Sequence, residues 1–363
     1  MRIQVKPYLL ATLFISFLSI QANAADEAQT KSQDKETVEE KESPWLATPT
    51  FSSSPKLGNS IGALGAYLHK FDEKSPTSTL TAMGSYSDTD SSFYGVFGTA
   101  YFLADEHRIK IGALKGEIEN EYEDYLGTGF NAITTDNVRV SFISYTKRFE
   151  SNWFLGLQMV GMEYEVLAGD QQTQIILDSI GLSALNSNGI GGVIERDTRD
   201  SQNSPQSGSL FNFNSLAFRD SFGGDKNYDT YTTKYNQFFS HGDGHVVAIQ
   251  VDGRWTHNAP VAAYSSVNLR GYTQGEYLAP NSVTFQAEER FAINDRWGAT
   301  GFIGAACLYG DEASCDDKGN WYPALGAGVT YMLKVKDRMV VRAEFALGKN
   351  DSRGFFIQFG NSF

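Results

Sequence analysis

Apolar and polar side chains alternate one by one in segments of about ten residues through most of this chain. In one such segment Val283, Phe285 and Phe291 fall on one face, and Gln286 and Glu288 fall on the other. A period of two residues is that of a β-strand, whose successive side chains point to opposite faces. After residue 24 no run approaches the roughly 18 apolar residues that a membrane-spanning helix requires. The pattern therefore predicts a chain made almost entirely of β-strands.

About sixteen such segments lie between residues 48 and 363, the first at 48–54 and the last at 353–363. The 35 glycines, 9 prolines and 13% aromatic residues suit many strands joined by turns. A soluble sandwich would turn the apolar faces inward, whereas a membrane barrel turns them outward and keeps charges in its lumen. Alternation alone does not separate the two. The single long array of strands, a final Phe363 and an N-terminal leader favour an all-β transmembrane antiparallel β-barrel.

The first residues have the pattern of a secretory signal peptide. Arg2 and Lys6 precede or flank an apolar stretch, and Ala22 and Ala24 supply a small-residue cleavage site, so we expect a leader at 1–24. Residues 25–46 are mostly polar and cannot offset the entropy of ordering, which predicts a disordered spacer before a barrel at 47–363. The net charge of −13 argues against a nucleic-acid partner, since binding phosphates takes clustered Lys and Arg.

The predicted connections sort into two classes by length. The short ones, 150–152, 240–245, 294–296 and 334–337, all fall on one rim, and the long ones, 118–136, 167–188, 258–282 and 310–320, all fall on the other. Bacterial outer-membrane barrels have short periplasmic turns and long extracellular loops. We therefore expect a Gram-negative outer-membrane protein, surrounded by membrane lipid and lipopolysaccharide, with both barrel ends facing the periplasm.

Three sequence motifs lie at separate places along the predicted barrel. The long loop at 258–282 carries Arg270, Gly271 and Tyr272, and the next strand carries Glu288 in the sequence Gln-Ala-Glu-Glu-Arg. Residues 195–200 read Glu-Arg-Asp-Thr-Arg-Asp, and residues 348–356 read Gly-Lys-Asn-Asp-Ser-Arg-Gly-Phe-Phe. Together they resemble the BamA/TamA outer-membrane assembly barrels, the bacterial surface antigen family.

That resemblance implies a role for each matched residue. The sixth extracellular loop would fold inward so that Arg270 docks on Glu288, with Gly271 allowing a sharp turn and Tyr272 packed beside the pair. A desolvated guanidinium needs a carboxylate, and Asp252 and Glu344 also point inward by parity. The best-known members carry an aspartate where this chain has Gly304, so the contact would rest on Glu288. The alternative is an extracellular loop whose arginine is solvated.

The resemblance covers roughly the whole barrel and extends to two further sites. The strand-turn-strand signature of the family would be formed by Asp197, Arg199 and Asp200. Phe363 would be the barrel's own assembly signal. Family members that receive clients usually do so with POTRA repeats, and the predicted spacer has no room for one, so we expect a member lacking POTRA domains.

The remaining chemistry-bearing residues predict no enzyme and no cofactor. Cys307 and Cys315 lie close together in a chain bound for an oxidising compartment, which predicts one local disulfide. A metal site is not expected, because His241 and His245 flank an ordinary Gly-Asp-Gly turn. The acidic residues near the cysteines lack calcium-loop spacing; they are Asp311, Glu312, Asp316 and Asp317. None of the five histidines accompanies a nucleophile motif.

The first and last predicted strands would close the barrel at a weak seam. The strand at 48–54 is short, and Pro49 lacks the N–H that a ladder bond requires. In the resembling family such a seam admits substrate strands, so one hypothesis is insertion or translocation of outer-membrane proteins, with unfolded clients or assembly machinery as partners. The other hypothesis is a stand-alone pore or structural barrel without assembly activity.

Overall fold

The computed structural model describes residues 43–54, 58–122, 132–179, 183–272, 277–311, 313–335, 338–349, 352–361 and 363. The predicted signal peptide at 1–24, and the predicted spacer as far as residue 42, lie outside these residues. The first strand begins at Trp45, two residues before the predicted start of the barrel at 47.

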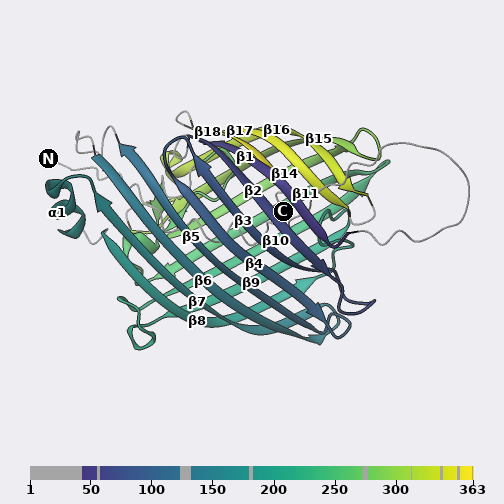
Figure 1. Cartoon of the computed structure of the whole chain (residues 1–363), viewed down its shortest axis with the longest axis horizontal. Helices are drawn as coiled ribbons and strands as arrows, with labels where there is room; N and C mark the ends of the chain where they lie inside the picture. The colour runs from purple at the N-terminus through teal and green to yellow at the C-terminus, as the bar shows by residue number, and fades with distance from the viewer. Residues whose placement is uncertain are drawn as a thin grey trace, which may run out of the picture.

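Sixteen strands within the described residues form one closed antiparallel barrel, as predicted (Figure 1). They are β1 (Trp45–Ser54), β2 (Gly58–His69), β3 (Ser78–Ser87), β4 (Ser92–Phe102), β5 (His107–Tyr122), β6 (Ala132–Glu150), β7 (Trp153–Ala168), β8 (Ala184–Asp197), β9 (Gly208–Phe218), β10 (Tyr228–His241), β11 (His245–His257), β14 (Asn281–Ala292), β15 (Trp297–Tyr309), β16 (Trp321–Lys334), β17 (Met339–Leu347) and β18 (Arg353–Phe359). Neighbours in the wall are neighbours in the chain, except that β11 pairs with β14 and β18 closes onto β1.

The wall has its polar side chains buried and its apolar side chains exposed. On β14, Gln286 and Glu288 are 7% and 1% exposed, whereas Phe285 and Phe291 are 47% and 48% exposed. A closed sheet has only an inner and an outer face, so the exposed apolar side chains cover the outside. This is the inverted pattern of a membrane barrel, and it settles the choice against a soluble sandwich.

Aromatic side chains line the outer face near the rim where β1 begins. Successive ring contacts join Trp45 to Tyr67 at 4.8 Å between centroids, His69 to Phe71 at 4.6 Å and Phe102 to His107 at 5.4 Å. Further along the wall, Trp297 and Tyr331 meet at 4.9 Å. A belt of amphipathic rings marks the membrane-water boundary in barrels of this kind.

The longest hairpins extend further than the sequence predicted. We expected 118–136 to be a loop, but β5 continues to Tyr122 and β6 begins at Ala132. The Thr135 hydroxyl donates to a Glu119 carboxylate oxygen across this extension, 2.9 Å away. The two strands carry polar residues on both faces here, so the apolar alternation that marks a membrane strand is lost although the ladder continues.

The predicted loop at 167–188 is also shorter than expected. It contains the helix α1 (Gln171–Ser179), which projects from one end of the barrel in Figure 1, and β8 begins at Ala184. The Asp170 side chain caps the helix by accepting hydrogen bonds from the Gln172 and Thr173 N–H groups, both at 2.9 Å. No helix among the described residues is long and apolar enough to cross a membrane.

Two isoleucines of similar exposure test where the membrane lies. Ile303 is 67% exposed in the middle of β15, and Ile293 is 65% exposed in the turn that precedes this strand. We expect Ile303→Arg to destabilise the protein inserted in lipid vesicles, with a loss of about 2–4 kcal/mol in the free energy of unfolding. For Ile293→Arg we expect a loss of about 0–1 kcal/mol. Urea titration of the vesicle-inserted protein measures both. Equal losses would contradict an outer face buried in lipid at the level of Ile303.

Candidate functional site

The segment after β11 is attached to the inner face of the wall. Its short strand β12 (Ser265–Ser266) pairs with β13 (Leu278–Ala279), and a 3-10 turn, η4 (Val261–Ala263), precedes it. Arg254 on β11 donates to the Ser265 hydroxyl at 3.0 Å and to the Ala263 carbonyl oxygen at 2.9 Å. The following residues Val267 and Leu269 are 0% and 4% exposed. This segment therefore packs against inward-facing side chains.

Arg270 contacts two buried carboxylates on different strands. Its Nη1 donates to Glu288 on β14 at 2.6 Å and to Glu344 on β17 at 2.7 Å. Its Nε donates to the Gln286 amide oxygen at 3.2 Å. The guanidinium carbon lies 3.5 Å from the centroid of the Phe302 ring. The geometry provides opposite charge on one side and an aromatic face on the other, which is how a desolvated arginine is accommodated.

Glu288 is shared by three arginines. Besides Arg270, it accepts from Arg290 at 2.8 Å and from Arg342 at 3.1 Å, and its side chain is fully buried. Glu344 lies 3.7 Å from Arg342. We call Arg270, Glu288, Arg290, Arg342 and Glu344 the Arg270 cluster; its three cations and two anions hold one another in the wall of β14 and β17. Breaking such a set by removing one partner leaves a buried charge uncompensated.

Gly304 has a steric role that the sequence did not reveal. A Cβ at this position would lie 2.8 Å from Leu269 Cδ1 and 2.9 Å from the Phe285 carbonyl oxygen. Leu269 thus occupies the space in which an aspartate side chain would stand. The second carboxylate near Arg270 comes instead from Glu344, so the contact does not rest on Glu288 alone. Asp252, the other inward candidate, lies 3.9 Å from Lys234 instead.

Gly271 and Tyr272 fasten the same segment to β16 and β17. Gly271 has a φ of +93°, and a Cβ there would lie 3.2 Å from the backbone of Leu347, so a larger residue would be strained. The Tyr272 hydroxyl donates to the Pro323 carbonyl oxygen at 2.6 Å and accepts from the Lys349 N–H at 2.7 Å. The ring is 7% exposed.

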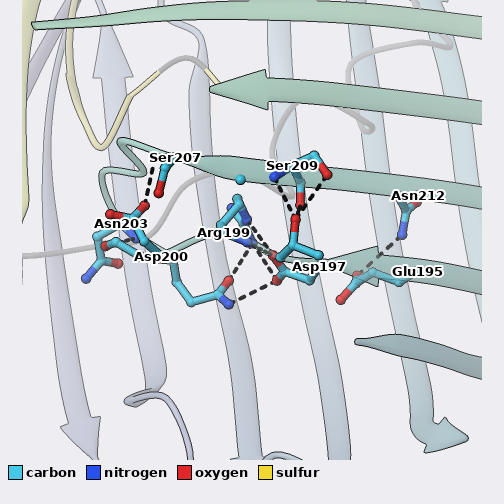
Figure 2. A network of polar contacts seen from close by, with 12 residues as sticks. Glu195, Asp197, Arg199, Asp200, Asn203, Ser207, Ser209 and Asn212 are labelled. Carbon is cyan, nitrogen blue, oxygen red and sulfur yellow. Dashed lines mark hydrogen bonds and ion pairs between the residues drawn. The ribbon is translucent and has the colours of Figure 1, made fainter. Parts of the chain in front are cut away.

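The turn between β8 and β9 is organised by the residues that the sequence singled out (Figure 2). Arg199 folds back over Asp197, with Nε at 2.9 Å from one carboxylate oxygen and Nη2 at 3.0 Å from the other. Asp200 accepts from the Gln206 N–H at 2.9 Å and from the Ser207 N–H at 3.1 Å. Burial raises the pKa of Asp200, but hydrogen bonds, first among them the one from Arg338, outweigh it and hold this pKa below its ordinary value.

Arg108 on β5 connects the base of this turn to a strand that lies beyond β6 and β7 in the wall, and sequence reasoning missed it. Its guanidinium pairs with Asp105, Glu195 and Asp197, and lies 3.7 Å from the Phe154 ring centroid. It is 4% exposed. The available signal was parity, because Arg108 shares its face of β5 with Leu114 and Ile118, both buried.

The other candidate residues lie apart from these clusters. Cys307 at the end of β15 is disulfide-bonded to Cys315, with the Cα atoms 5.9 Å apart. His241 and His245 stack on each other at the β10–β11 turn, and His241 pairs with Glu289 at 2.8 Å. Among the described residues, no three His, Cys, Asp or Glu side chains are grouped so that they could hold a metal ion. Glu312 lies outside the described residues.

The seam between β1 and β18 has a short ladder. Within the described residues β1 pairs with β2 over ten residue pairs but with β18 over three, which join residues 51–53 to residues 355–357. Residues 45–50 of β1 therefore have no strand partner on this side. Leu46, 4% exposed, packs in one apolar cluster with Leu64 of β2 and Met339 of β17. Apolar contact replaces the ladder at that end of the seam.

In the sequence Phe363 has the same parity as Phe355 and Ile357, which predicts a place on the outer face of the last strand, but the structure places it elsewhere. Strand β18 ends at Phe359, and Gly360 has a φ of +78°, which redirects the chain. Phe363 is 7% exposed and packs with inward-facing Phe238, Val246 and Ala248. Its carbonyl oxygen accepts from Arg290 at 2.7 Å. This backbone change could not be read from alternation.

The architecture is similar to that of three solved outer-membrane barrels. Against BamA from Haemophilus ducreyi lacking POTRA domains 1–3, the TM-score is 0.54 at 13% identity, covering 91% of this chain and 74% of that one. Against CdiB from Acinetobacter baumannii it is 0.58 at 10% identity, covering 87% and 59%. Against CdiB from Escherichia coli it is 0.59 at 9% identity, covering 94% and 66%.

These matches show that the chain has the 16-stranded fold of the BamA and CdiB barrels. It spans less than two thirds of the length of either CdiB chain. No family model and no curated relative matches the sequence.

Two inward carboxylates form a matched pair for testing the Arg270 cluster. Glu344→Ala would leave Arg270 and Arg342 with one shared carboxylate in a buried site, so we expect it to lower the free energy of unfolding by about 3–5 kcal/mol. Asp252→Ala removes only a 3.9 Å pair with a part-exposed lysine and should cost about 1 kcal/mol or less. Denaturant titration followed by tryptophan fluorescence measures both. Equal losses of unfolding free energy in the two variants would show that Glu344 does not compensate buried arginine charge as proposed.

We expect the effects of substitutions at Gly304 and Leu269 on the free energy of unfolding to be coupled. Gly304→Asp forces its side chain against Leu269, and we expect a loss of about 1–3 kcal/mol in unfolding free energy. Leu269→Ala alone removes buried apolar contact and also destabilises. The double variant Gly304→Asp with Leu269→Ala should lose less than the sum of the two, because the clash is gone. Strict additivity would mean that the segment does not pack against β15.

Proposed function

We propose that this chain is an outer-membrane barrel that assists insertion or translocation of other outer-membrane proteins at the β1–β18 seam. The observation that carries the proposal is the unpaired edge of β1 at residues 45–50. Unpaired strand edges present free N–H and C=O groups and accept an added strand. The same fold in the BamA and CdiB barrels supports the proposal.

The register of the seam supports an edge that is free to accept a strand. Ser53 faces Phe355 and Phe51 faces Ile357, so a straight continuation would bring Gly360 opposite Thr48 and Phe363 opposite Trp45. The chain turns at Gly360 instead, and Phe363 lies against Arg290 on the inner side. The segment that would complete the ladder therefore occupies the lumen, and the edge of β1 is left for another strand.

The segment that carries Arg270 corresponds, in this proposal, to the inward-folded sixth loop of the assembly barrels. Its contacts with Glu288, Pro323 and Glu344 tie it to β14, β16 and β17, and β17 is the wall neighbour of the seam strand β18. The loop would brace the wall beside the seam. This role makes Arg270, Gly271, Tyr272 and Glu288 supports of the seam strands.

The proposal also sets location and partners. The barrel would lie in the outer membrane among lipid and lipopolysaccharide, with the rim that carries Trp45 and Phe363 facing the periplasm. Unfolded outer-membrane proteins, or the machinery that delivers them, would be the partners. The alternative is a stand-alone structural barrel or pore, in which the unpaired edge of β1 is covered by lipid.

Photo-crosslinking at two exposed alanines separates these functions. A photo-crosslinking amino acid in place of Ala47 would lie on the unpaired part of β1, whereas one in place of Ala327 would lie on β16, which is paired on both sides. In proteoliposomes that receive a radiolabelled unfolded outer-membrane protein, we expect adducts from position 47 and not from position 327.

The opposite result has a clear meaning. Equal adducts at both positions would indicate contact through lipid without use of the seam. No adduct at either, from protein that is fully inserted and carries a steady ion conductance, would favour the stand-alone barrel.

A further inference from the structure

The β8–β9 turn reaches across the mouth of the barrel to the opposite wall. Asp200 forms an ion pair with Arg338, which lies in the turn between β16 and β17. Four strands, β10, β11, β14 and β15, separate β9 from β16 along the wall. A contact between residues so far apart around the wall is made only if the turn crosses the lumen.

Two further contacts hold the turn in this position. Asn361, after β18, donates to the Ser204 hydroxyl at 2.9 Å. Arg290 on β14 donates to the Pro205 carbonyl oxygen at 3.2 Å. The turn is thus attached to the β16–β17 turn, to the segment after β18 and to β14, and we call Arg338, Asn361 and Arg290 the far-wall anchors.

The turn has a shape of its own that does not depend on these anchors. Asp197 is bound by Arg199 and accepts from the Gln202 amide at 3.0 Å (Figure 2). At its base, Thr198 and Ser209 exchange hydrogen bonds, including Ser209 N–H to the Thr198 hydroxyl at 2.9 Å. The turn can therefore swing about its base as one body when the far-wall anchors break.

A cavity of about 370 Å³ lies between this turn and the Arg270 segment. Gln202, Asn203 and Pro205 of the turn line one end, and Ala263, Ser266 and Asn268 of the loop line the other. Thr232, on the inner face of β10, lines the side between them. The lumen is thus a chamber that is covered at both ends by segments of the chain.

The two covers differ in strength. The ion pair of Asp200 with Arg338 is partly exposed, with the side chains 29% and 35% accessible, so it is worth little and is screened by salt. Arg270, in contrast, is paired with carboxylates whose side chains are fully buried. We propose that the β8–β9 turn is a gate: it closes the lumen at the rim of the chain ends, and it opens before the Arg270 segment does.

Access to one introduced thiol tests the gate. Both native cysteines are in the disulfide, so T232C supplies a single reactive thiol in the chamber. A membrane-impermeant maleimide is added to one side of proteoliposomes. Asp243→Cys, in the β10–β11 turn, reports on access from the rim of the chain ends. Ser221→Cys, in the β9–β10 connection, reports on access from the opposite rim.

In the T232C background, Arg338→Ala with Asn361→Ala removes two far-wall anchors and leaves the turn itself unchanged. We expect the thiol to react about tenfold faster from the rim of the chain ends, and at an unchanged rate from the other rim. Arg296→Ala is the matched control: this exposed arginine lies on the same rim, but its described side-chain contacts, with the Met332 and Leu333 carbonyl oxygens and the Tyr331 ring, all lie at the end of β16. It should not change the rate.

The gate is refuted if the thiol reacts as fast in the T232C parent as in the exposed Asp243→Cys control, because the chamber would then be open. It is also refuted if the anchor substitutions leave the rate unchanged or raise it equally from both rims. Should the double variant not fold, Asp200→Asn removes the charge and keeps an oxygen for the Gln206 and Ser207 N–H groups. It should give a smaller increase on the same side. None of these outcomes depends on whether the seam accepts clients.

Discussion

Closing sixteen strands into one barrel creates an interior that the wall side chains alone do not fill. Other segments of the chain enter this space. A barrel of about eight strands is filled by its own inward side chains, whereas one of sixteen strands encloses open space. Here the chain supplies three further segments to that space: the loop around Arg270, the β8–β9 turn and the residues after β18. Each carries polar backbone into the lumen and needs partners on the wall.

Charged side chains on the inner wall are those partners, and several of them bind more than one group at once. Glu288 receives Arg270 from the loop, Arg290 and Arg342 from the wall, while Arg290 also binds Pro205 in the turn and Phe363 after β18. Arg290 thus contacts the β8–β9 turn, the residues after β18 and Glu288, which is the carboxylate that holds the loop around Arg270. Because buried charges are costly when unpaired, loss of one segment raises the cost of keeping the others in place. The lumen contents are therefore coupled through β14.

Sequence reasoning captured what depends on parity and failed where the backbone leaves the ladder. The two-residue period predicted about sixteen strands and the inward positions of Glu288 and Glu344, because both follow from side-chain alternation. The two rims were separated by the lengths of the connections instead. It could not rank Glu344 above Asp252, since both point inward and only the position of the loop separates them. It placed Phe363 on the outer face because a positive φ at Gly360 leaves no trace in the alternation. Arg108 was missed because two of its partners, Glu195 and Asp197, come from a distant part of the chain.

The residues after Phe359 affect both the seam and the contents of the lumen. The residues after Phe359 can extend the β1–β18 ladder or bind inside the barrel, but not both, since Phe363 cannot face Trp45 while its carbonyl oxygen accepts from Arg290. Ladder bonds of β1 are exchanged for one arginine contact, one Asn361–Ser204 bond and burial of a phenylalanine against Phe238. The inner arrangement also supports the β8–β9 turn through Ser204. A longer seam ladder would therefore loosen the cover of the lumen, and a tightly closed lumen requires a short seam.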